Sequence, residues 1–467
     1  MRRWLAAAAG VLAWGLAIPG EPVRMVMLGG NAGEPAVAAH VANARALGFG
    51  AVWGYSHQVG SWTGAGPRKR PRVTRGFVAL ARECHASGME VWVSVNPVAD
   101  TGERFAFSDD RGERALLDFA ALLRKKAGVR HLVLSFDDQP TDLTLLADIF
   151  RYGRVAAAAH LDLARRLRAA LPADTELWLC ASAYCDGHLG DGSTPYAKAF
   201  LAGLPALPES IGIVWTGPRV ISPSITRADL AATRARLGGR RLFLYDNFPA
   251  DGGGADGLAL VLGALRHREP GILEEIAVYL AAPMDFLGAS RLPLATTADF
   301  LREPRAYDPD AAAARAVARL AGPSVEAAKA LEVQQMEWGG FVDGRNYWSR
   351  DAMNARAAAG RLNDPAFVDS FTWTAARYPA RMHALAGLAD AAFRSDLLTV
   401  MARRLAVARA MPLAIEYLAR VRAGRPDAAD VLAQIDRERA SWSGAPDTAR
   451  VLETFLATAG VPAPVSR

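Results

Sequence analysis

The sequence predicts an α/β fold, in which an eightfold TIM-type (β/α)8 barrel is followed by an all-α helical domain. Between residue 24 and about residue 300, short apolar runs alternate with longer amphipathic segments, as in parallel strands covered by helices. Eight such runs can be counted, and eight β/α units in this length indicate a closed barrel. A doubly wound open sheet is the alternative. It is disfavoured because no Gly-rich phosphate loop follows the first run at the required spacing.

The predicted strands share an apolar core, flanking turn residues and a helical stretch that follows. They cover residues 24–28, 51–55, 90–95, 131–136, 176–180, 211–215, 241–245 and 276–280. The barrel domain is therefore expected to span residues 23–304.

The composition of the sequence changes after Pro304, where alanine, arginine and leucine dominate and runs of β-branched residues disappear. Helical periodicity continues to about residue 459, so we expect a helical domain over residues 305–467. The predicted helices cover residues 310–321, 324–337, 365–374, 376–391 and parts of 396–459, with breaks at 339–345 and 424–426.

The first residues have the layout of a secretory signal. Two arginines precede an apolar stretch over residues 4–17, and Gly15 and Ala17 are small residues suited to cleavage. We expect a signal peptide over residues 1–22 and a secreted or periplasmic protein. The alternative is that translation begins at Met25, which would make the protein cytoplasmic. No apolar stretch reaches the ~20 residues of a spanning helix, so we expect no integral membrane span.

The composition is that of a foldable globular protein, with 51% hydrophobic and 22% charged residues in a chain of 467. The net charge is +6, from 54 basic and 48 acidic residues. Basic residues cluster tightly only around Arg68, Lys69, Arg70 and Arg72, which we interpret as a solvated loop and not a nucleic-acid site. The three cysteines form neither a disulfide framework nor a zinc pattern, and we expect no metal or cofactor.

The active site of a β/α barrel lies at the carboxyl ends of its strands, so polar residues that follow the predicted strands are the candidates. Asp137 and Asp138 follow the fourth predicted strand and Tyr184 follows the fifth. Thr216 follows the sixth predicted strand and Asn247 follows the seventh. Alone, Tyr184 would be an aromatic residue of the barrel rim, and Thr216 and Asn247 would be turn residues. We expect all five to line one pocket.

The adjacent carboxylates of Asp137 and Asp138 are the basis for predicting the reaction. Crowded anions push one pKa upward, which leaves one ionised group and one protonated acid near neutral pH. That is the division of labour needed to hydrolyse a glycosidic bond. The alternative is that the pair caps the following helix or holds a cation.

Four groups of residues, in order and with sensible spacing, resemble glycoside hydrolase family 84. This family contains the protein O-GlcNAcases and the bacterial β-N-acetylglucosaminidases once called hyaluronidases. The matching segments are residues 134–138 (LSFDD), 214–218 (VWTGP) with 222–226 (SPSIT), 245–249 (YDNFP) and 299–309 (DFLREPRAYDP). The resemblance covers roughly residues 24–320.

The resemblance implies substrate-assisted catalysis, in which the acetamido oxygen of the sugar attacks the anomeric carbon and two inversions give net retention. Asp137 would hold the acetamido N–H, and Asp138 would be the general acid and then the general base. Tyr184 would donate to the acetamido oxygen, Thr216 would line the pocket, and Asn247 would fix the acetamido and carboxylate geometry.

The remaining family contacts match less closely. Gly30 is a looser match to a first-strand glycine whose backbone touches a sugar hydroxyl. His57 stands where the family has a lysine, and Gly252 where it has an aspartate, with Asp251 one position early. Ala282 replaces an asparagine. Recognition of the N-acetyl group is therefore better supported than the identity of the sugar.

The sequence thus predicts a β-N-acetylhexosaminidase that acts on a terminal 2-acetamido sugar of a glycan or glycoconjugate. The alternative is a glycan-binding barrel that has lost turnover and carries a helical partner-binding domain. The sequence leaves the sugar, the aglycone and the oligomeric state open.

Overall fold

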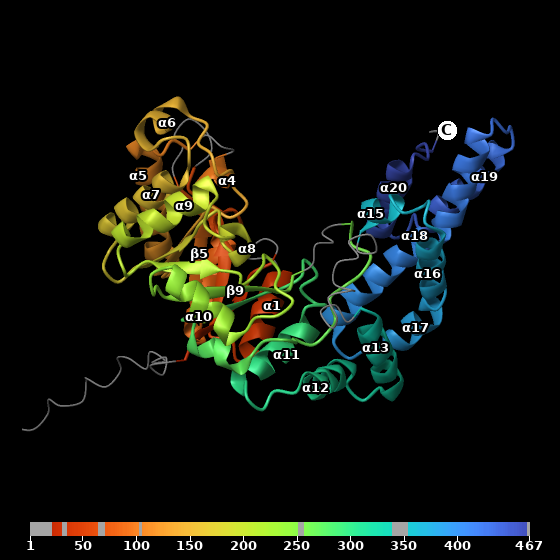
Figure 1. The fold of residues 1–467 in the computed structure, drawn as a ribbon. Helices are drawn as coiled ribbons and strands as arrows, with labels where there is room; N and C mark the ends of the chain where they lie inside the picture. Colours follow the sequence, from red (N-terminus) through yellow and green to blue (C-terminus); the bar gives the residue numbers. More distant parts are fainter. Residues whose placement is uncertain are drawn as a thin grey trace, which may run out of the picture. The chain divides into compact units, whose positions relative to one another are not determined.

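The computed structural model describes residues 21–29, 35–63, 71–101, 105–250, 256–338 and 354–464 (Figure 1). Eight strands close into a barrel in the order β1-β10-β9-β8-β7-β6-β5-β2. They are β1 (Val23–Met27), β2 (Ala51–Tyr55), β5 (Glu90–Val95), β6 (His131–Ser135), β7 (Glu176–Cys180), β8 (Gly212–Trp215), β9 (Leu242–Pro249) and β10 (Val278–Ala282). The pairs from β1 through β2, β5, β6, β7 and β8 to β9 are parallel. The predicted barrel is confirmed.

The observed strands follow the predicted ones closely, and the largest difference is at β9. This strand was expected to end at Tyr245 but continues to Pro249. Its recorded register with β8 stops at Leu244, so Tyr245 and the residues after it extend beyond the part that pairs with β8. A short hairpin, β3 (Gly60–Ser61) with β4 (Arg72–Val73), follows β2.

Helices alternate with the strands, and four of the connecting helices begin at a side-chain cap. Thr74, Asp109, Thr194 and Thr226 each accept a backbone N–H at the start of the next helix. The connecting helices of the barrel are α1 (Pro35–Ala46), α3 (Arg75–Ala86), α5 (Asp110–Ala127), α7 (Ala157–Ala170), α9 (Pro195–Gly203) and α10 (Arg227–Arg236). Short helices α2 (Ser56–Val59), α4 (Pro97–Thr101), α6 (Leu146–Tyr152) and α8 (Asp186–Leu189) occupy the loops after β2, β5, β6 and β7.

Aromatic side chains fill the barrel interior. Trp53, Trp92, Trp178 and Phe243 are buried in one cluster. Phe243 meets the three indoles edge-on, with ring centroids 5.8 to 6.0 Å apart. The interior is therefore a packed core, and polar chemistry is confined to the loops and strand ends at the rim.

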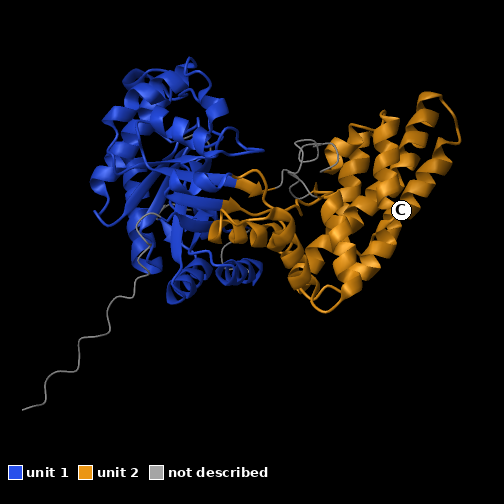
Figure 2. Cartoon of the chain, turned by 60° about the horizontal axis from the view of Figure 1, so that its bottom comes forward, with its two compact units in different colours: residues 1–246, 269–280 blue, residues 247–268, 281–467 orange. Residues whose placement is uncertain are grey.

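The chain divides into two compact units (Figure 2). Unit 1 comprises residues 1–246 and 269–280, and unit 2 comprises residues 247–268 and 281–467. The division thus falls close to the ends of β9 and β10. The domain boundary at residue 304 stays a prediction.

Unit 2 is mainly helical, as expected. Its helices are α11 (Arg291–Arg302), α12 (Pro309–Ala321), α13 (Val325–Glu337), α15 (Ala355–Ala359), α16 (Pro365–Ala375), α17 (Tyr378–Leu385), α18 (Ala391–Arg422), α19 (Ala428–Ser441) and α20 (Pro446–Ala459). The single helix expected over residues 376–391 is shorter, because the chain turns after Leu385 and Asp390 then caps α18. The expected break at 424–426 separates α18 from α19, whereas the break at 339–345 lies outside the described residues.

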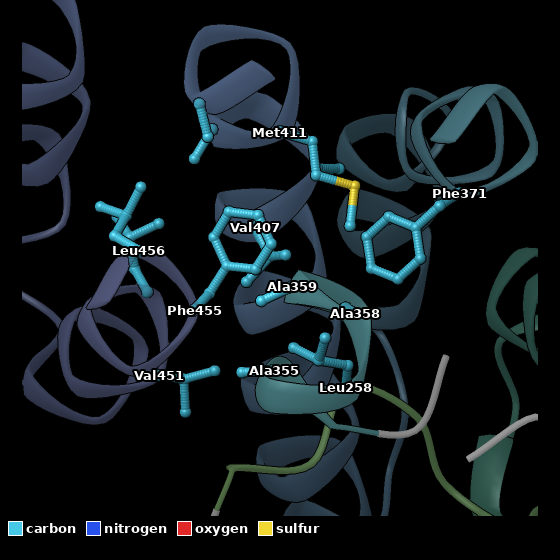
Figure 3. Close-up of a cluster of buried hydrophobic side chains, with 14 of the residues drawn as sticks. Leu258, Ala355, Ala358, Ala359, Phe371, Val407, Met411, Val451, Phe455 and Leu456 are labelled. Carbon is cyan, nitrogen blue, oxygen red and sulfur yellow. The ribbon is translucent and has the colours of Figure 1, made fainter. Parts of the chain in front are cut away.

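A buried cluster joins the helices of unit 2. Phe371 of α16, Met411 of α18 and Phe455 of α20 are directed into it, together with Leu258 from the segment before α11 (Figure 3). Burial of such large side chains contributes roughly 1.5–3 kcal/mol each. Within the described part of the chain, no helix is both long and apolar enough to cross a membrane. The predicted signal peptide lies almost entirely in residues 1–20, which are not described.

Candidate active site

The two adjacent aspartates lie directly after β6, at the carboxyl end of the strand. Asp138 has a φ of 56°, in the left-handed region, which aspartate tolerates better than most residues. The backbone turns there, with Gln139 N donating to Phe136 O at 3.3 Å. As a result Asp137 is half-buried, whereas Asp138 is exposed. The two carboxylates therefore have different environments despite being neighbours in sequence.

Two buried side chains donate hydrogen bonds to the Asp137 carboxylate. The Ser135 hydroxyl donates to Oδ1, and Asn96 Nδ2 donates to the same oxygen at 3.3 Å. Burial raises the pKa of Asp137 above its ordinary value, and the Ser135 hydrogen bond opposes that effect. The negative charge of Asp138 also raises the pKa of Asp137, but less than burial does.

The raised pKa belongs to the other carboxyl than the sequence suggested. Mutual repulsion was expected to raise the pKa of one of the pair, with Asp138 as the acid, but the pKa that rises is that of Asp137, the residue expected to hold the acetamido N–H. The main cause is burial, because the turn at Asp138 sends one carboxyl toward the barrel and the other toward solvent.

Tyr184 lies in the loop between β7 and α8 and is buried. Its hydroxyl donates to Asp138 Oδ1 at 2.5 Å. Burial, followed by that hydrogen bond, raises the pKa of Tyr184 well above its ordinary value. The phenol therefore stays protonated and is a permanent hydrogen-bond donor. The exposed ring of His188 meets Tyr184 edge-on, with centroids 4.7 Å apart.

Thr216 follows β8 and is buried, but its hydroxyl is engaged within the protein. It donates to Arg219 O at 2.9 Å and to Tyr184 O at 3.4 Å, and Thr216 N also donates to Tyr184 O at 2.9 Å. Gly217 then adopts a φ of 99°, which favours glycine. Thr216 thus ties the loop after β8 to the backbone of Tyr184.

His57 lies on α2, after β2, and is exposed. Its ring stacks on the ring of Tyr55, with the two ring centroids 5.5 Å apart. The helix is held from both sides, because Gln58 Oε1 accepts from Tyr55 N at 2.9 Å and Gln58 Nε2 donates to Leu28 O at 3.2 Å. His57 is therefore presented to solvent from a fixed short helix at the carboxyl end of β2.

The remaining predicted residues lie on other strands or outside the described part of the chain, and their roles stay predictions. Asn247 lies on the carboxyl-terminal part of β9 and is assigned to unit 2. Ala282 ends β10. Gly30, Asp251 and Gly252 lie outside the described residues. In unit 1 the Tyr184 hydroxyl joins Asp138, and Thr216 is tied to the same loop through the backbone of Tyr184. Asp137, the neighbour of Asp138 in sequence, is held separately by Ser135 and Asn96.

Residues that sequence reasoning did not assign to the site also contribute. Asn96 directly follows β5, so the same strand-end rule could have found it. Ser135 is the last residue of β6, and the alternation of side chains along that strand directs it to the same side as the interior residue Val133. Asp100 of α4 accepts from Ser56 Oγ at 2.5 Å and from Trp62 Nε1 at 2.6 Å, which links the loops after β2 and β5.

No group of three or more His, Cys, Asp or Glu side chains suited to a metal ion occurs among the described residues. Cys84, Cys180 and Cys185 are free and buried. The aspartate pair is instead surrounded by hydroxyl and amide donors. A barrel with two such carboxylates at the carboxyl end of a strand has the architecture of a glycoside hydrolase.

Comparisons with known proteins agree with this class. The model of the β-N-acetylglucosaminidase family matches residues 67–334, more than half of the chain. The chain therefore belongs to the β-N-acetylglucosaminidase family, glycoside hydrolase family 84, and it is a glycoside hydrolase.

Solved structures share the fold. An O-GlcNAc hydrolase from Thermobaculum terrenum is 19% identical, with a TM-score of 0.61 over 93% of this chain and 94% of that chain. The structure of CpGH84B is 15% identical, with a TM-score of 0.59 over 92% of this chain and 77% of that chain.

Proposed function

We propose that this glycoside hydrolase is a retaining β-N-acetylhexosaminidase that uses the acetamido group of its own substrate as the nucleophile. The observation that carries the proposal is the unequal pair of carboxylates after β6. Asp137 is half-buried and hydrogen-bonded to two neutral donors, whereas Asp138 is exposed at the rim. A buried carboxylate suits a fixed electrostatic role, and an exposed one suits proton exchange with the leaving group and with water.

In the first step the acetamido oxygen attacks the anomeric carbon while the bond to the leaving oxygen breaks. The electron pair of that bond goes to the leaving oxygen, which takes a proton from Asp138. Asp137 accepts a hydrogen bond from the acetamido N–H, where positive charge develops as the oxazoline-type ring forms. In the second step Asp138 takes a proton from water, whose oxygen attacks the anomeric carbon and reopens the ring. Two inversions leave the product with the configuration of the substrate.

The other predicted residues have supporting roles in this proposal. Tyr184 donates to the acetamido oxygen, and Thr216 shapes the pocket by holding the loop of Tyr184. Asn247 fixes the acetamido and carboxylate geometry. His57, Gly30 and Asp251 contact sugar hydroxyls, at positions where this chain matches its family less closely.

The substrate class follows from the nucleophile. A sugar without the acetamido group would lack the attacking oxygen, so we propose a terminal 2-acetamido sugar on a glycan or glycoconjugate. The T. terrenum protein is named as an O-GlcNAc hydrolase, which favours a β-linked N-acetylglucosamine. We also propose export of the protein through the signal-like residues 1–22, with a cytoplasmic location as the alternative if translation begins at Met25.

Incubation with a chromogenic aryl N-acetyl-β-glucosaminide tests the proposal directly. The wild-type chain should release the phenol, and Asp137→Asn and Asp138→Asn should each be impaired. Release of the phenol from the matching plain β-glucoside should be negligible.

The alternative is a glycan-binding barrel with lost turnover, and it is favoured by the changes at His57, Gly252 and Ala282. That alternative predicts binding of N-acetylglucosamine without release of phenol by the wild-type chain. Measurement of N-acetylglucosamine binding by calorimetry beside the assay therefore separates the two functions.

A further inference from the structure

Both side-chain donors to Asp137 meet the same oxygen. Ser135 Oγ and Asn96 Nδ2 donate to Oδ1 of Asp137, and the structure records no hydrogen bond from the described residues to Oδ2. Ser135 and Asn96 are 1% and 7% exposed, so solvent does not compete effectively for either donor. One carboxylate oxygen thus receives both recorded side-chain hydrogen bonds.

The two donors come from neighbouring strands, and the orientation of Asn96 is fixed independently of Asp137. Asn96 directly follows β5, and its Oδ1 accepts from Ala99 N of α4 at 3.0 Å. That bond orients the amide so that Nδ2 faces the loop after β6, where it also reaches Asp137 O at 3.4 Å. Ser135 approaches from β6 itself. The carboxylate is therefore held from two elements of the rigid barrel.

The titratable groups recorded as interacting electrostatically with the Asp137 carboxyl, among the described residues, are all acids. These groups are Asp138 in the same loop, Cys180 of β7, Tyr184 after β7, Tyr55 of β2 and Tyr245 of β9. Each of the five side chains is neutral when protonated and negative when ionised, so none can carry a positive charge. Burial disfavours the ionised form of Asp137, so hydrogen-bond donors have to stabilise it.

We propose that Ser135 and Asn96 are positioning residues that hold Asp137 as a carboxylate by Oδ1 and present Oδ2 to the acetamido N–H of the sugar. This inference rests on the proposed function, because it assigns a partner to Oδ2 only if Asp137 receives the acetamido group. It adds two residues whose effect on the reaction is exerted through Asp137, without contact with the reacting atoms.

The test compares Ser135→Ala and Asn96→Ala with a matched control, Ser94→Ala. Ser94 is a fully buried serine on the adjacent strand β5, paired in register with Val133. Its hydroxyl has no hydrogen-bond partner in the described part of the chain. The control therefore removes the same atom from the same barrel interior without touching Asp137. The measurement is the pH dependence of kcat/KM on the aryl N-acetyl-β-glucosaminide, with thermal unfolding to verify folding.

The acid limb of the kcat/KM profile reports loss of an essential carboxylate by protonation. Removal of a donor raises the pKa of Asp137 further, so Ser135→Ala and Asn96→Ala should shift this limb upward, each by about one pH unit. The value of kcat/KM at the optimum should fall about tenfold or more. Ser94→Ala should leave the limb in place. If Ser135→Ala does not fold, Asn96→Ala provides the same readout.

A folded Ser135→Ala or Asn96→Ala variant with an unmoved acid limb would overturn the inference, as would an equal shift in Ser94→Ala. Failure of the proposed function gives a different result. In that case the wild-type chain does not cleave the N-acetylglucosaminide, or Asp137→Asn retains full activity.

Discussion

Tyr184 donates its only hydroxyl proton to Oδ1 of Asp138, at 2.5 Å, across two loops of the barrel rim. In the proposed reaction the same hydroxyl donates to the acetamido oxygen. Because one O–H serves one strong acceptor at a time, substrate binding has to move this hydrogen bond away from Asp138. The release of Asp138 for proton transfer would then be coupled to recognition of the acetamido group.

Tyr184→Phe should therefore impair turnover more than folding. A hydrogen bond to a charged or developing-charge acceptor contributes about 1.5–3 kcal/mol, so we expect kcat/KM to fall about 10- to 150-fold. Burial keeps the pKa of Tyr184 well above its ordinary range. Ionisation of Tyr184 should therefore not contribute to the basic limb of the pH profile of kcat/KM, and this limb should be the same in wild type and Tyr184→Phe. A folded Tyr184→Phe variant with wild-type kcat/KM would remove Tyr184 from the site.

Asp138→Ala should harm substrates with poor leaving groups more than substrates with acidic phenols, because the acid protonates the leaving oxygen. Asp137→Ala is the matched control, since a residue that acts on the acetamido group should affect all leaving groups similarly. The measurement is kcat/KM across a series of aryl N-acetyl-β-glucosaminides of graded phenol pKa. Equal slopes for the two variants would contradict the assignment of Asp138 as the acid.

Activity should persist after exhaustive treatment with EDTA. The acetamido oxygen supplies the nucleophile and Asp138 the proton, so the proposed reaction requires no Lewis acid. The alternative interpretation of the aspartate pair, as a cation site, makes the opposite prediction. Complete loss of turnover with EDTA, restored by a divalent cation, would assign the pair to metal binding.

The stability of the barrel should depend on Glu176 at the opposite, amino ends of the strands. His131 Nδ1 lies 3.4 Å from Glu176 Oε2, and this close contact, together with the nearby Arg241 guanidinium, lowers the pKa of Glu176 to about 2. A lowered carboxyl pKa stabilises the fold above the unfolded value of about 4.3, and that contribution is lost as the pH falls toward 2.

Glu176→Gln should therefore lower the free energy of unfolding at pH 7, by at most about 1 kcal/mol because Glu176 is 40% exposed. The difference from wild type should shrink between pH 4 and pH 2. Urea unfolding at several pH values measures it, with the exposed Glu83→Gln as the control. An unchanged difference at pH 2 would show that Glu176 acts through packing and not through its charge.

The barrel could be predicted from sequence because each strand is a short apolar run between turn residues. The runs at 51–55, 90–95 and 176–180 match β2, β5 and β7 residue for residue. β9 was predicted too short because Asp246 and Asn247 look like turn residues. Asp246 is instead buried and accepts from Tyr279 of β10 at 2.6 Å, a long-range contact that local sequence does not reveal.

The candidate site could be predicted only in part. The strand-end rule located Asp137, Asp138 and Tyr184, and the structure joins Tyr184 to Asp138 by a hydrogen bond and Asp137 to Ser135. It did not reveal that Tyr184 bonds to Asp138 in the free protein, or that the Thr216 hydroxyl is engaged by backbone carbonyls. Those details depend on side-chain orientation, which is set by packing between strands distant in sequence.

In the proposed reaction the acetamido oxygen of the substrate is the nucleophile. The most direct test is kcat for aryl β-glucosaminides whose N-acetyl group carries zero, one, two or three fluorine atoms. Fluorine withdraws electrons from the carbonyl oxygen and weakens it as a nucleophile, so we expect kcat to fall steeply with each added fluorine. A kcat that does not change across the series would contradict substrate assistance and would indicate attack by an enzyme carboxylate or by water.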